Sequence, residues 1–309
     1  MRLSDLGAAL ERIGAVTLET LARDAQATDD AALKALAARP QPALRYSERY
    51  LSNISFAEPM IIWPGQPQGQ PPSPTAPSLM RIGPWLRSAF VTTLPSDLAG
   101  ATPAEQEAAF DHGDSQWMRI AVALADGAFT QYPARELPRD FDARKRAWYR
   151  VAQKTAGLHW DVPVPGPLGR TLRLPVALPL QRDGQDVGVA MGDLSVPELT
   201  QRLALVDMPG FLDAYLVTAE GLVTARRGLE AQVLKPGMNL EAALDLPRLA
   251  DAELLRRMAA GEHGGYIKEG EKLVVFSRLI SPPWYYVAEF DRAPYLSTAQ
   301  RETERAPSE

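Results

Sequence analysis

Residues 173–193, RLPVALPLQRDGQDVGVAMGD, place two apolar runs on either side of an Asp-Gly pair at 183 and 184. Glycine adopts the positive φ that a tight hairpin requires without steric cost, so an X-Gly pair between strand-forming runs predicts an antiparallel hairpin. Three further X-Gly pairs between apolar or alternating runs follow the same pattern, Asp126-Gly127, Glu220-Gly221 and Glu269-Gly270. The sequence therefore predicts four hairpins from residue 115 onward.

The predicted elements repeat in order. Each half reads as strand, turn, strand, helix, strand, turn, strand, with helices expected at about 143–156 and 240–260, and WYYVAEF at 284–290 as the last strand. Antiparallel sheets with segregated helices are typical of the α+β class. We therefore predict two tandem PAS-like modules, each an antiparallel sheet with flanking helices. A connecting helix is expected over 195–207, where Ser195 and Glu198 have the spacing of a capping box.

The N-terminal part has a different pattern. Leucine and isoleucine recur at helical spacing from Leu3, and Pro40 ends the pattern, so a long helix is predicted over residues 3–38. A second short helix is predicted over 44–54. The stretch PGQPQGQPPSPTAP is rich in proline, glycine and glutamine and predicts an exposed loop. The expected organisation is an N-terminal helical segment (1–54), a distal module (55–195) with the proline-rich insertion at 64–77, a connecting helix with a proximal module (196–293), and a C-terminal tail (294–309).

Composition excludes several classes of function. The chain has 309 residues, a net charge of −5 and no cysteine. The acidic charge argues against nucleic acid as a partner, and the lack of cysteine excludes disulfides and thiolate chemistry. No run of about 18 apolar residues or signal-peptide pattern is found. The chain is therefore expected to be either a soluble protein or the ectodomain of a membrane protein whose transmembrane helices lie outside it.

Motifs for enzymatic chemistry are not found in the sequence. It contains no GxSxG, no GxxxxGK[ST], and no GxGxxG between a predicted strand and helix. The three histidines, His112, His159 and His263, are far apart and form no metal-binding pattern. We therefore expect no catalytic residues, no cofactor and no metal site.

The segment YPARELPRDFDARKRAWYRVA, residues 132–152, resembles the signature of double-Cache sensor domains. The matching residues are Tyr132, Pro133, Asp142, Arg144, Arg146, Trp148, Tyr149 and Ala152. The segments GVAMGDLSVPELT, FLDAYLVTAEGLVTARR and GGYIKEGEKLVVFSRLISPPWYYVAEFD are similar to later parts of that family's two modules. The resemblance covers about residues 115–291. It implies a ligand-binding module that senses a small molecule outside the cytoplasm.

In the amino-acid-binding members of that family, residues on this same stretch hold the ligand. The resemblance implies that Arg146 and Trp148 hold a ligand carboxylate, that Tyr149 lines the pocket, and that Asp193 binds the ligand ammonium. A guanidinium offers paired donors for a carboxylate, and a carboxylate can neutralise a desolvated amine. A structural alternative remains for Arg146, which could brace Asp142, and for Asp193, which could cap the following helix.

Two positions depart from the family's amine-binding pattern. Phe141 stands where that pattern prefers tyrosine, and Val164 stands where it has an aromatic residue. Trp160 or Asp161, from a shifted loop, would have to substitute for the missing side chain. The resemblance therefore implies a sensor more directly than it implies an amino-acid sensor.

The function expected is that of the ligand-binding sensor domain of a bacterial transmembrane signalling protein, of chemoreceptor, histidine kinase or cyclase type. It would lie in the periplasm and recognise a small metabolite, with amino acids, amines and carboxylates as candidates. The proximal module, including Tyr215, Arg226 and Tyr266, is expected to bind no ligand. A homodimer through the N-terminal helix is also expected. The alternatives are a free-standing soluble binding protein and a ligand-free dimerisation module.

Overall fold

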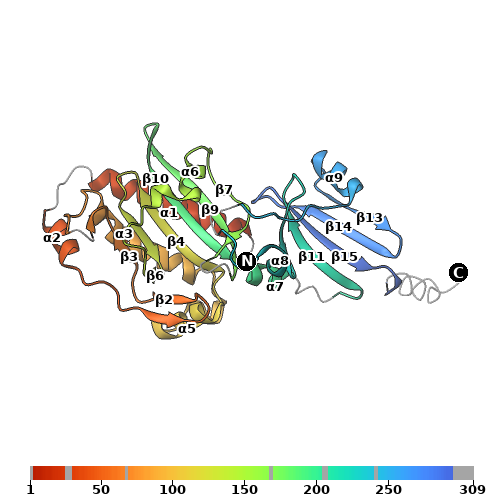
Figure 1. Cartoon of the computed structure of the whole chain (residues 1–309), viewed down its shortest axis with the longest axis horizontal. Helices are drawn as coiled ribbons and strands as arrows, with labels where there is room; N and C mark the ends of the chain where they lie inside the picture. Colours follow the sequence, from red (N-terminus) through yellow and green to blue (C-terminus); the bar gives the residue numbers. More distant parts are fainter. Residues whose placement is uncertain are drawn as a thin grey trace, which may run out of the picture. The chain divides into compact units, whose positions relative to one another are not determined.

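The computed structural model describes residues 3–24, 30–66, 69–166, 170–203, 208–239 and 243–294. It divides the chain into two compact units, each with its own antiparallel sheet (Figure 1). The first unit comprises Met1–Val162 and Arg173–Ser195, and the second comprises Pro163–Leu172 and Val196–Glu309. The α+β fold with two sheet-and-helix units agrees with the sequence prediction. The C-terminal tail predicted over 294–309 lies outside the described residues beyond Pro294.

The helices of the first unit are more numerous than the sequence suggested. The helix predicted over 3–38 is present as two helices, and residues 25–29 between them lie outside the described residues. No helix was predicted between 78 and 114, where the structure has three. The helices are α1 (Leu3–Asp24), α2 (Asp30–Ala38), α3 (Ala76–Val91), α4 (Ser96–Ala99), α5 (Pro103–His112), the 3-10 helix η2 (Ala143–Lys145) and α6 (Ala147–Ala152).

The main sheet of the first unit is antiparallel and has the strand order β3-β5-β4-β10-β9-β7. A smaller sheet has the order β1-β2-β6 and lies with α5 at the lower end of the unit in Figure 1. The strands are β1 (Arg45–Ser47), β2 (Ser52–Ser55), β3 (Met60–Ile62), β4 (Trp117–Leu124), β5 (Phe129–Tyr132), β6 (Ala134–Arg135), β7 (His159–Trp160), β9 (Leu172–Arg182) and β10 (Gln185–Ser195).

The short helix predicted over 44–54 was wrong, because this segment forms the hairpin β1–β2. Two hydrogen bonds close its turn: the backbone N–H of Leu51 donates to the Glu48 carbonyl (3.3 Å) and that of Tyr50 to the Ser47 hydroxyl (3.3 Å). Leu51 adopts a positive φ of 48°. A serine side chain that binds the nearby backbone competes with helix formation, which apolar spacing alone does not reveal.

The two faces of the main sheet have different covers. On one face, α1 packs against α3 and β10, so closely that a Cβ on Gly14 would lie 2.7 Å from Leu178 Cδ2. On the other face, Ala121, Met191 and Ala177 form a buried cluster with Tyr149 of α6. Because side chains alternate along a strand, the odd-numbered residues of β4, β9 and β10 around this cluster share the α6 face.

The second unit repeats the plan with an antiparallel sheet in the order β12-β11-β15-β14-β13. Tyr215, Val217, Phe276 and Val287 form its core, on which Leu254 of α9 packs. Its elements are β8 (Val164–Pro165), α7 (Val196–Leu203), β11 (Phe211–Val217), β12 (Val223–Arg226), α8 (Leu229–Val233), α9 (Ala252–Ala259), β13 (Gly264–Glu269), β14 (Lys272–Arg278) and β15 (Tyr285–Asp291). The connecting helix is α7, and residues 204–207 of its predicted range lie outside the described residues.

All four predicted X-Gly hairpins are present. They join β4 to β5, β9 to β10, β11 to β12, and β13 to β14. The glycine of each pair has a positive φ, for example 75° at Gly184. The predicted helices near 143–156 and 240–260 are shorter than expected, as α6 and α9, and residues 240–242 lie outside the described residues.

Candidate functional site

The α6 face of the first unit's sheet has an apolar part. Ala121, Ala123, Phe129 and Met191 provide small and apolar side chains from three adjacent strands, and Tyr149 packs on them. Phe141 and Trp148 are partly buried against the same cluster, with the Phe141 ring 5.0 Å from that of Phe129. The structure therefore places three of the predicted site residues, Phe141, Trp148 and Tyr149, over one patch of sheet.

Tyr149 is the most enclosed of these three residues. It is 2% exposed, and its hydroxyl has no hydrogen-bond partner among the described residues. Burial raises the pKa of this hydroxyl above its usual value. A buried hydroxyl without a partner is uncommon and has a cost in stability. The Tyr149 side chain therefore retains the capacity for one more polar contact.

The loop before α6 is fixed by a charged pair. Asp142 caps η2 by accepting the backbone N–H of Arg144 (3.0 Å), and its two oxygens also accept the Arg144 Nε and Nη2 (2.9 Å each). These hydrogen bonds from Arg144 lower the pKa of the Asp142 carboxyl. Arg144 therefore braces Asp142.

Arg146 lies between η2 and α6 in an extended conformation (φ −79°, ψ 148°). Its backbone carbonyl accepts the N–H of Arg150 in the first turn of α6 (3.2 Å). The guanidinium carbon lies 5.0 Å from the centre of the Phe141 ring, a cation–π geometry. Arg146 therefore joins the aromatic group over the sheet.

Trp160 and Asp161 lie at the edge strand β7. Trp160 pairs with Val176 of β9, and directly opposed residues share a sheet face, so Trp160 is on the α1 face and not on that of Asp193. The Asp161 backbone N–H donates to the Pro175 carbonyl (3.0 Å), and its carboxylate accepts the backbone N–H of Val162 (2.8 Å). The strand register thus separates Trp160 from the predicted ligand site, which the sequence alone could not show.

Asp193 lies at the polar end of the α6 face, two residues beyond Met191 on β10. It is 2% exposed and forms ion pairs with Arg119 of β4 (Nη2 to Oδ2, 2.7 Å) and Arg173 of β9 (Nη1 to Oδ2, 3.4 Å). Strand register explains the first pair, because Asp193 stands opposite Arg119. The resemblance implied that Asp193 binds a ligand ammonium, but in the structure its carboxylate is already paired with two guanidiniums.

A third arginine and an amide complete this polar end. Arg135 of β6 donates from Nε to the Ser52 hydroxyl (3.0 Å). Gln131 of β5 is fully buried, and neither its Oε1 nor its Nε2 has a partner among the described residues. We call Arg119, Arg135, Arg173, Asp193 and Gln131 the arginine cluster.

A small cavity lies within the arginine cluster. Its volume is about 10 Å³, space for about one water molecule. Three of the cluster's arginines and Gln131 line it, with Tyr50 and Ile54 from the region of the β1–β2 hairpin on another side. Met118 and Pro133 complete the lining, which does not include Arg146 or Trp148. Phe141, Trp148 and Tyr149 thus pack on the sheet face that carries the arginine cluster, and this cavity lies only at the polar end of that face.

Burial destabilises the positive charges of two members of the arginine cluster, Arg173 and Arg135. Burial lowers the pKa of Arg173, and the Asp193 carboxylate opposes that effect. Burial, with added repulsion from Arg173 and Arg119, lowers the pKa of Arg135 to about 10. An added negative charge would therefore stabilise all three guanidiniums.

Sequence analysis did not identify four of the five members of the arginine cluster. One signal was present: Arg119 interrupts the apolar strand WMRIAVAL, and charged side chains are rarely placed in buried strands without a partner. The partner could not be found from the sequence, because the register of β4 against β10 brings Arg119 and Asp193 together.

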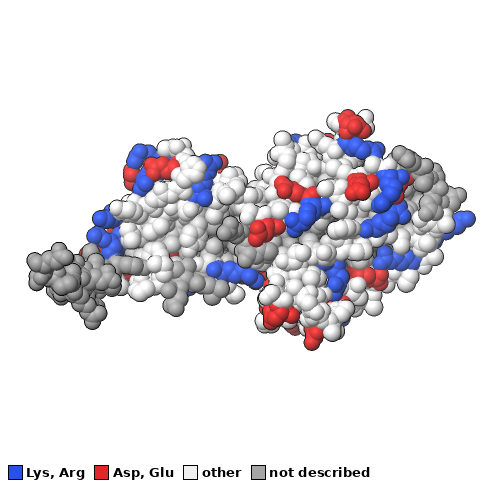
Figure 2. All heavy atoms as spheres, turned by 180° about the vertical axis from the view of Figure 1, so that it is seen from behind, with Lys and Arg blue, Asp and Glu red and all other residues white. Residues whose placement is uncertain are grey.

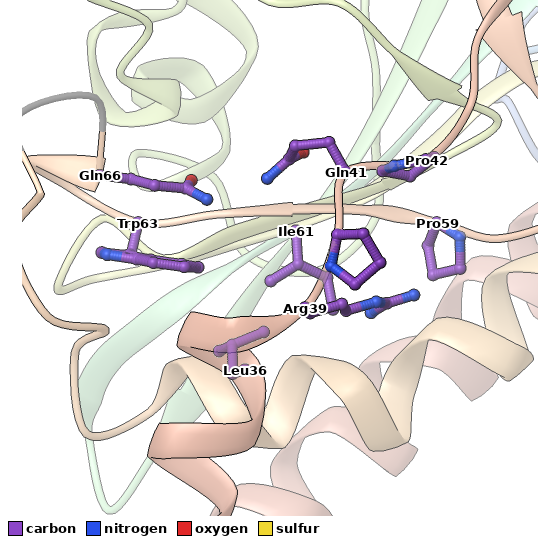
Figure 3. Close-up of a pocket in the computed structure, with 9 residues that line it drawn as sticks. Leu36, Arg39, Gln41, Pro42, Pro59, Ile61, Trp63 and Gln66 are labelled. Atoms are coloured by element: carbon purple, nitrogen blue, oxygen red, sulfur yellow. The ribbon is translucent and has the colours of Figure 1, made fainter.

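A second cavity of similar volume lies between α2 and β3 (Figure 3). Leu36, Ile61 and Trp63 give it an apolar wall, and Arg39 at its edge pairs with Glu58. The Trp63 Nε1 donates to the Gln70 carbonyl (2.8 Å). Arg39 and the Trp63 indole therefore already have polar partners, whereas the Gln131 amide has none among the described residues.

In the second unit, Tyr215 and Arg226 contact residues of neighbouring strands. The Tyr215 hydroxyl bonds to Glu289 (2.9 Å), and Arg226 pairs with Asp213 (2.7 Å) while covering the Tyr215 ring. Tyr266 is largely exposed. These contacts connect strands of the sheet.

Charged residues of both signs are interspersed on the face shown in Figure 2. Over the part of the chain that the structure describes, no helix is both long and apolar enough to cross a bilayer. Within the same residues, no group of three or more histidine, aspartate or glutamate side chains is placed to hold a metal ion.

Comparison with known proteins gives relatives of one kind. No protein-family model matches the chain. The methyl-accepting chemotaxis protein PctB of Pseudomonas aeruginosa is 34% identical over 109 residues, which is 35% of this chain and 17% of that protein. The chemotaxis protein McpA of Pseudomonas putida is 28% identical over 182 residues, 55% of this chain and 26% of that protein. The matches therefore span about a sixth to a quarter of the length of these relatives.

Solved structures similar to this one are ligand-binding domains of chemoreceptors. The PctB domain in complex with L-Arg is 21% identical, with a TM-score of 0.39, over 58% of this chain and 73% of that one. The CtaA domain of Pseudomonas fluorescens in complex with L-leucine is 21% identical, with a TM-score of 0.42, over 67% and 85%.

Proposed function

We propose that this chain is the ligand-binding sensor domain of a transmembrane signalling protein. Its two-module fold, like that of double-Cache domains, and its sequence similarity to chemotaxis receptors support the proposal. The sensor recognises a small metabolite and carries out no chemistry. In the whole receptor this domain lies outside the cytoplasm, in the periplasm, and is joined to the membrane by segments outside this chain.

The proposed site is the α6 face of the first unit, which is the distal module. The observation that carries this assignment is Gln131, a fully buried amide whose two polar atoms have no partner among the described residues. Buried polar groups are nearly always hydrogen-bonded, so a partner is expected from a ligand or water. Tyr149, on the same face, has an unpartnered hydroxyl as well. Arg146, Trp148 and Phe141 supply the aromatic side of the site.

Such a sensor transmits a signal only if the ligand binds one conformation more tightly than another. The narrow cavity between the arginine cluster and Tyr50 fits the ligand-free conformation, since it holds no more than about one water molecule. We propose that the ligand opens this cavity and stabilises a different position of the β1–β2 region.

Dimerisation through the N-terminal helix would need a surface other than its apolar stripe. Leu6, Leu10 and Ile13 of α1 are at most 3% exposed, because they pack inside the first unit. The stripe that predicted a dimer is thus used within one chain. A dimer formed by α1 would use its exposed positions, such as Glu11 and Arg12.

A thermal-shift screen of amino acids, amines, mono- and dicarboxylates and phosphate tests the proposal. We expect one chemical class to raise the Tm of the first unit's unfolding transition by several degrees. The Gln131→Leu variant should lose that response, whereas Gln201→Leu, at an exposed glutamine of α7, should keep it. A folded wild-type chain with no response to any class would contradict the sensor function and favour a ligand-free module.

A further inference from the structure

The arginine cluster has an excess of positive charge. Arg119, Arg135 and Arg173 stand against one carboxylate, that of Asp193, which Arg119 and Arg173 share, so two of the three positive charges are not balanced within the cluster. The charged groups that act on Arg135 are Arg173, Arg119 and Asp193. Buried charges are normally paired, because an unpaired one has lost its water and gained nothing in return. The charge balance in this pocket therefore favours an anion.

Unused hydrogen-bond donors are found at the same place. Arg119 Nε and Arg173 Nε are buried without partners among the described residues, as are both polar atoms of Gln131. Gln131 and the two arginines line one cavity. Guanidinium and amide N–H groups are donors, and guanidiniums bind carboxylate and phosphate oxygens with paired hydrogen bonds. The unused groups thus match an acceptor-rich ligand.

We propose that the arginine cluster binds a small dianion, carried either as two carboxylates or as one phosphate group, and that Asp193 orients Arg119 and Arg173 instead of receiving an ammonium. This inference rests on the proposed sensor function and specifies the ligand class for the same site. The dianion supplies the two negative charges that the cluster lacks.

An ammonium ligand fits this end of the site poorly. Asp193 Oδ2 already accepts Arg119 at 2.7 Å and Arg173 at 3.4 Å, so an ammonium would have to displace a guanidinium from it. The ammonium would also enter a space lined by three like charges. Like-charge contacts disfavour a partner and act as a device for specificity.

Access to the cluster is from the side of Arg119 and Arg135. The Arg119 side chain is 19% exposed, whereas that of Arg173 is 10% exposed. The Arg135 guanidinium donates to the Ser52 hydroxyl at the start of β2. Movement of Arg135 with the β1–β2 hairpin would widen the cavity without breaking the Asp193 ion pairs. Binding therefore shifts the hairpin to make room for the anion.

Isothermal titration of the full chain with matched probes tests the ligand class. Succinate and inorganic phosphate are the dianions, and 4-aminobutyrate has a protonated aminomethyl group in place of one carboxylate of succinate. We expect succinate or phosphate to bind and 4-aminobutyrate to be silent. Binding of phosphate alone would point to a phosphorylated metabolite, and binding of succinate alone to a dicarboxylate. Either result supports the dianion.

The Asp193→Asn variant distinguishes a dianion from a ligand that carries an ammonium, because it should affect their affinities differently. Removal of the only carboxylate in the cluster should leave dianion binding intact or tighten it by about tenfold. A ligand whose ammonium binds Asp193 would instead lose affinity by a hundredfold or more. The Asp140→Asn variant, at an exposed position, is the matched control and should change neither.

The Arg135→Gln variant covers the case in which Asp193→Asn does not fold. It should weaken dianion binding at least tenfold, with Arg139→Gln, at an exposed arginine, as its control. Binding of an amine or a neutral compound that survives Arg135→Gln would overturn the dianion inference and leave the sensor function standing. A wild-type chain that responds to no compound class in the thermal-shift screen would contradict both the dianion inference and the sensor function.

Discussion

Asp142 shows how one side chain sets the local backbone before α6. It accepts the backbone N–H of Arg144 and two N–H groups of its guanidinium, so it serves as helix cap and ion-pair partner together. The sequence left open whether Arg146 binds ligand or braces Asp142, and the structure shows Arg144 bracing Asp142. The Arg146 guanidinium lies over the Phe141 ring.

Asp142→Asn keeps a side-chain oxygen that can cap η2 but loses the ion pair with Arg144, so it should destabilise the first unit at neutral pH by up to about 1 kcal/mol, the range for a partly exposed pair. Arg144 holds the pKa of the Asp142 carboxyl below its usual value, so the ionised form stabilises the folded chain. That contribution is present above the unfolded pKa near 4 and is lost as pH falls through the lower folded pKa. In urea unfolding, the difference in free energy of unfolding between the wild type and Asp142→Asn should be smaller at about pH 3 than at about pH 7. A gap that is constant or wider at low pH would contradict this account.

The residues of the site were predictable only in part. The resemblance located Phe141, Trp148 and Tyr149, which do lie over one patch of sheet, and it singled out Asp193. It gave no sign that Asp193 has Arg119 and Arg173 as partners, because those contacts depend on the register of β4, β10 and β9. Trp160 illustrates the same limit, since a shift of one residue in pairing moves a side chain to the opposite face.

At the scale of elements, the sequence predicted the hairpins better than the helices. Each X-Gly turn requires a backbone conformation that glycine adopts freely, so the signal is local and specific. The helices α3 and α4 lack such a signal: α3 contains Pro84 and begins at Ala76, within the proline-rich stretch that predicts a loop. The start of α5 does have one, the capping box of Thr102 and Glu105, which sequence reasoning missed. Tertiary packing of Leu79, Ile82 and Phe90, all fully buried, stabilises α3 in spite of that composition.

Gly192 of β10, next to Asp193, packs closely against Trp117 of β4. A Cβ at Gly192 would lie 2.2 Å from the Trp117 ring, and Trp117 is fully buried. Gly192→Ala should therefore destabilise the first unit by about 1–3 kcal/mol, as overpacking does in other cores. The unfolding midpoint in urea measures the change.

The control for Gly192→Ala is Gly100→Ala, where a Cβ would meet nothing within 4 Å. Its effect should stay within about 0.5 kcal/mol, as for most exposed positions. Equal effects at the two glycines would show that the Trp117 contact does not constrain β10.

At the scale of the whole molecule, each unit has its own core. The cluster around Ala121 and Tyr149 belongs to the first unit, and the cluster around Tyr215 and Phe276 to the second. Separate cores allow separate unfolding transitions, so a single Tm does not describe the chain. The proposed ligand contacts only residues of the first unit.

Calorimetry of the full chain with a ligand from the screen should therefore move one transition and not the other. At a free concentration of about 100 Kd, binding stabilises the folded state by about 2.7 kcal/mol, roughly 5 to 10 °C for a unit of this size. The transition that moves should also be the one lowered by Gly192→Ala. A ligand that shifts both transitions equally would show that the two units unfold together or that both bind.

The covalent path from Asp193 to the next helix is very short. Only Leu194 and Ser195 separate Asp193 from Val196, where α7 begins, and the pairing of β10 with β4 is irregular between Asp193 and Leu194. So short a tether has almost no slack, since each residue spans at most about 3.6 Å. Any displacement of the Asp193 carboxylate is thus either absorbed by the bulge or delivered to α7. The stiffness of the backbone at this bulge then determines what fraction of a movement of Asp193 would reach α7.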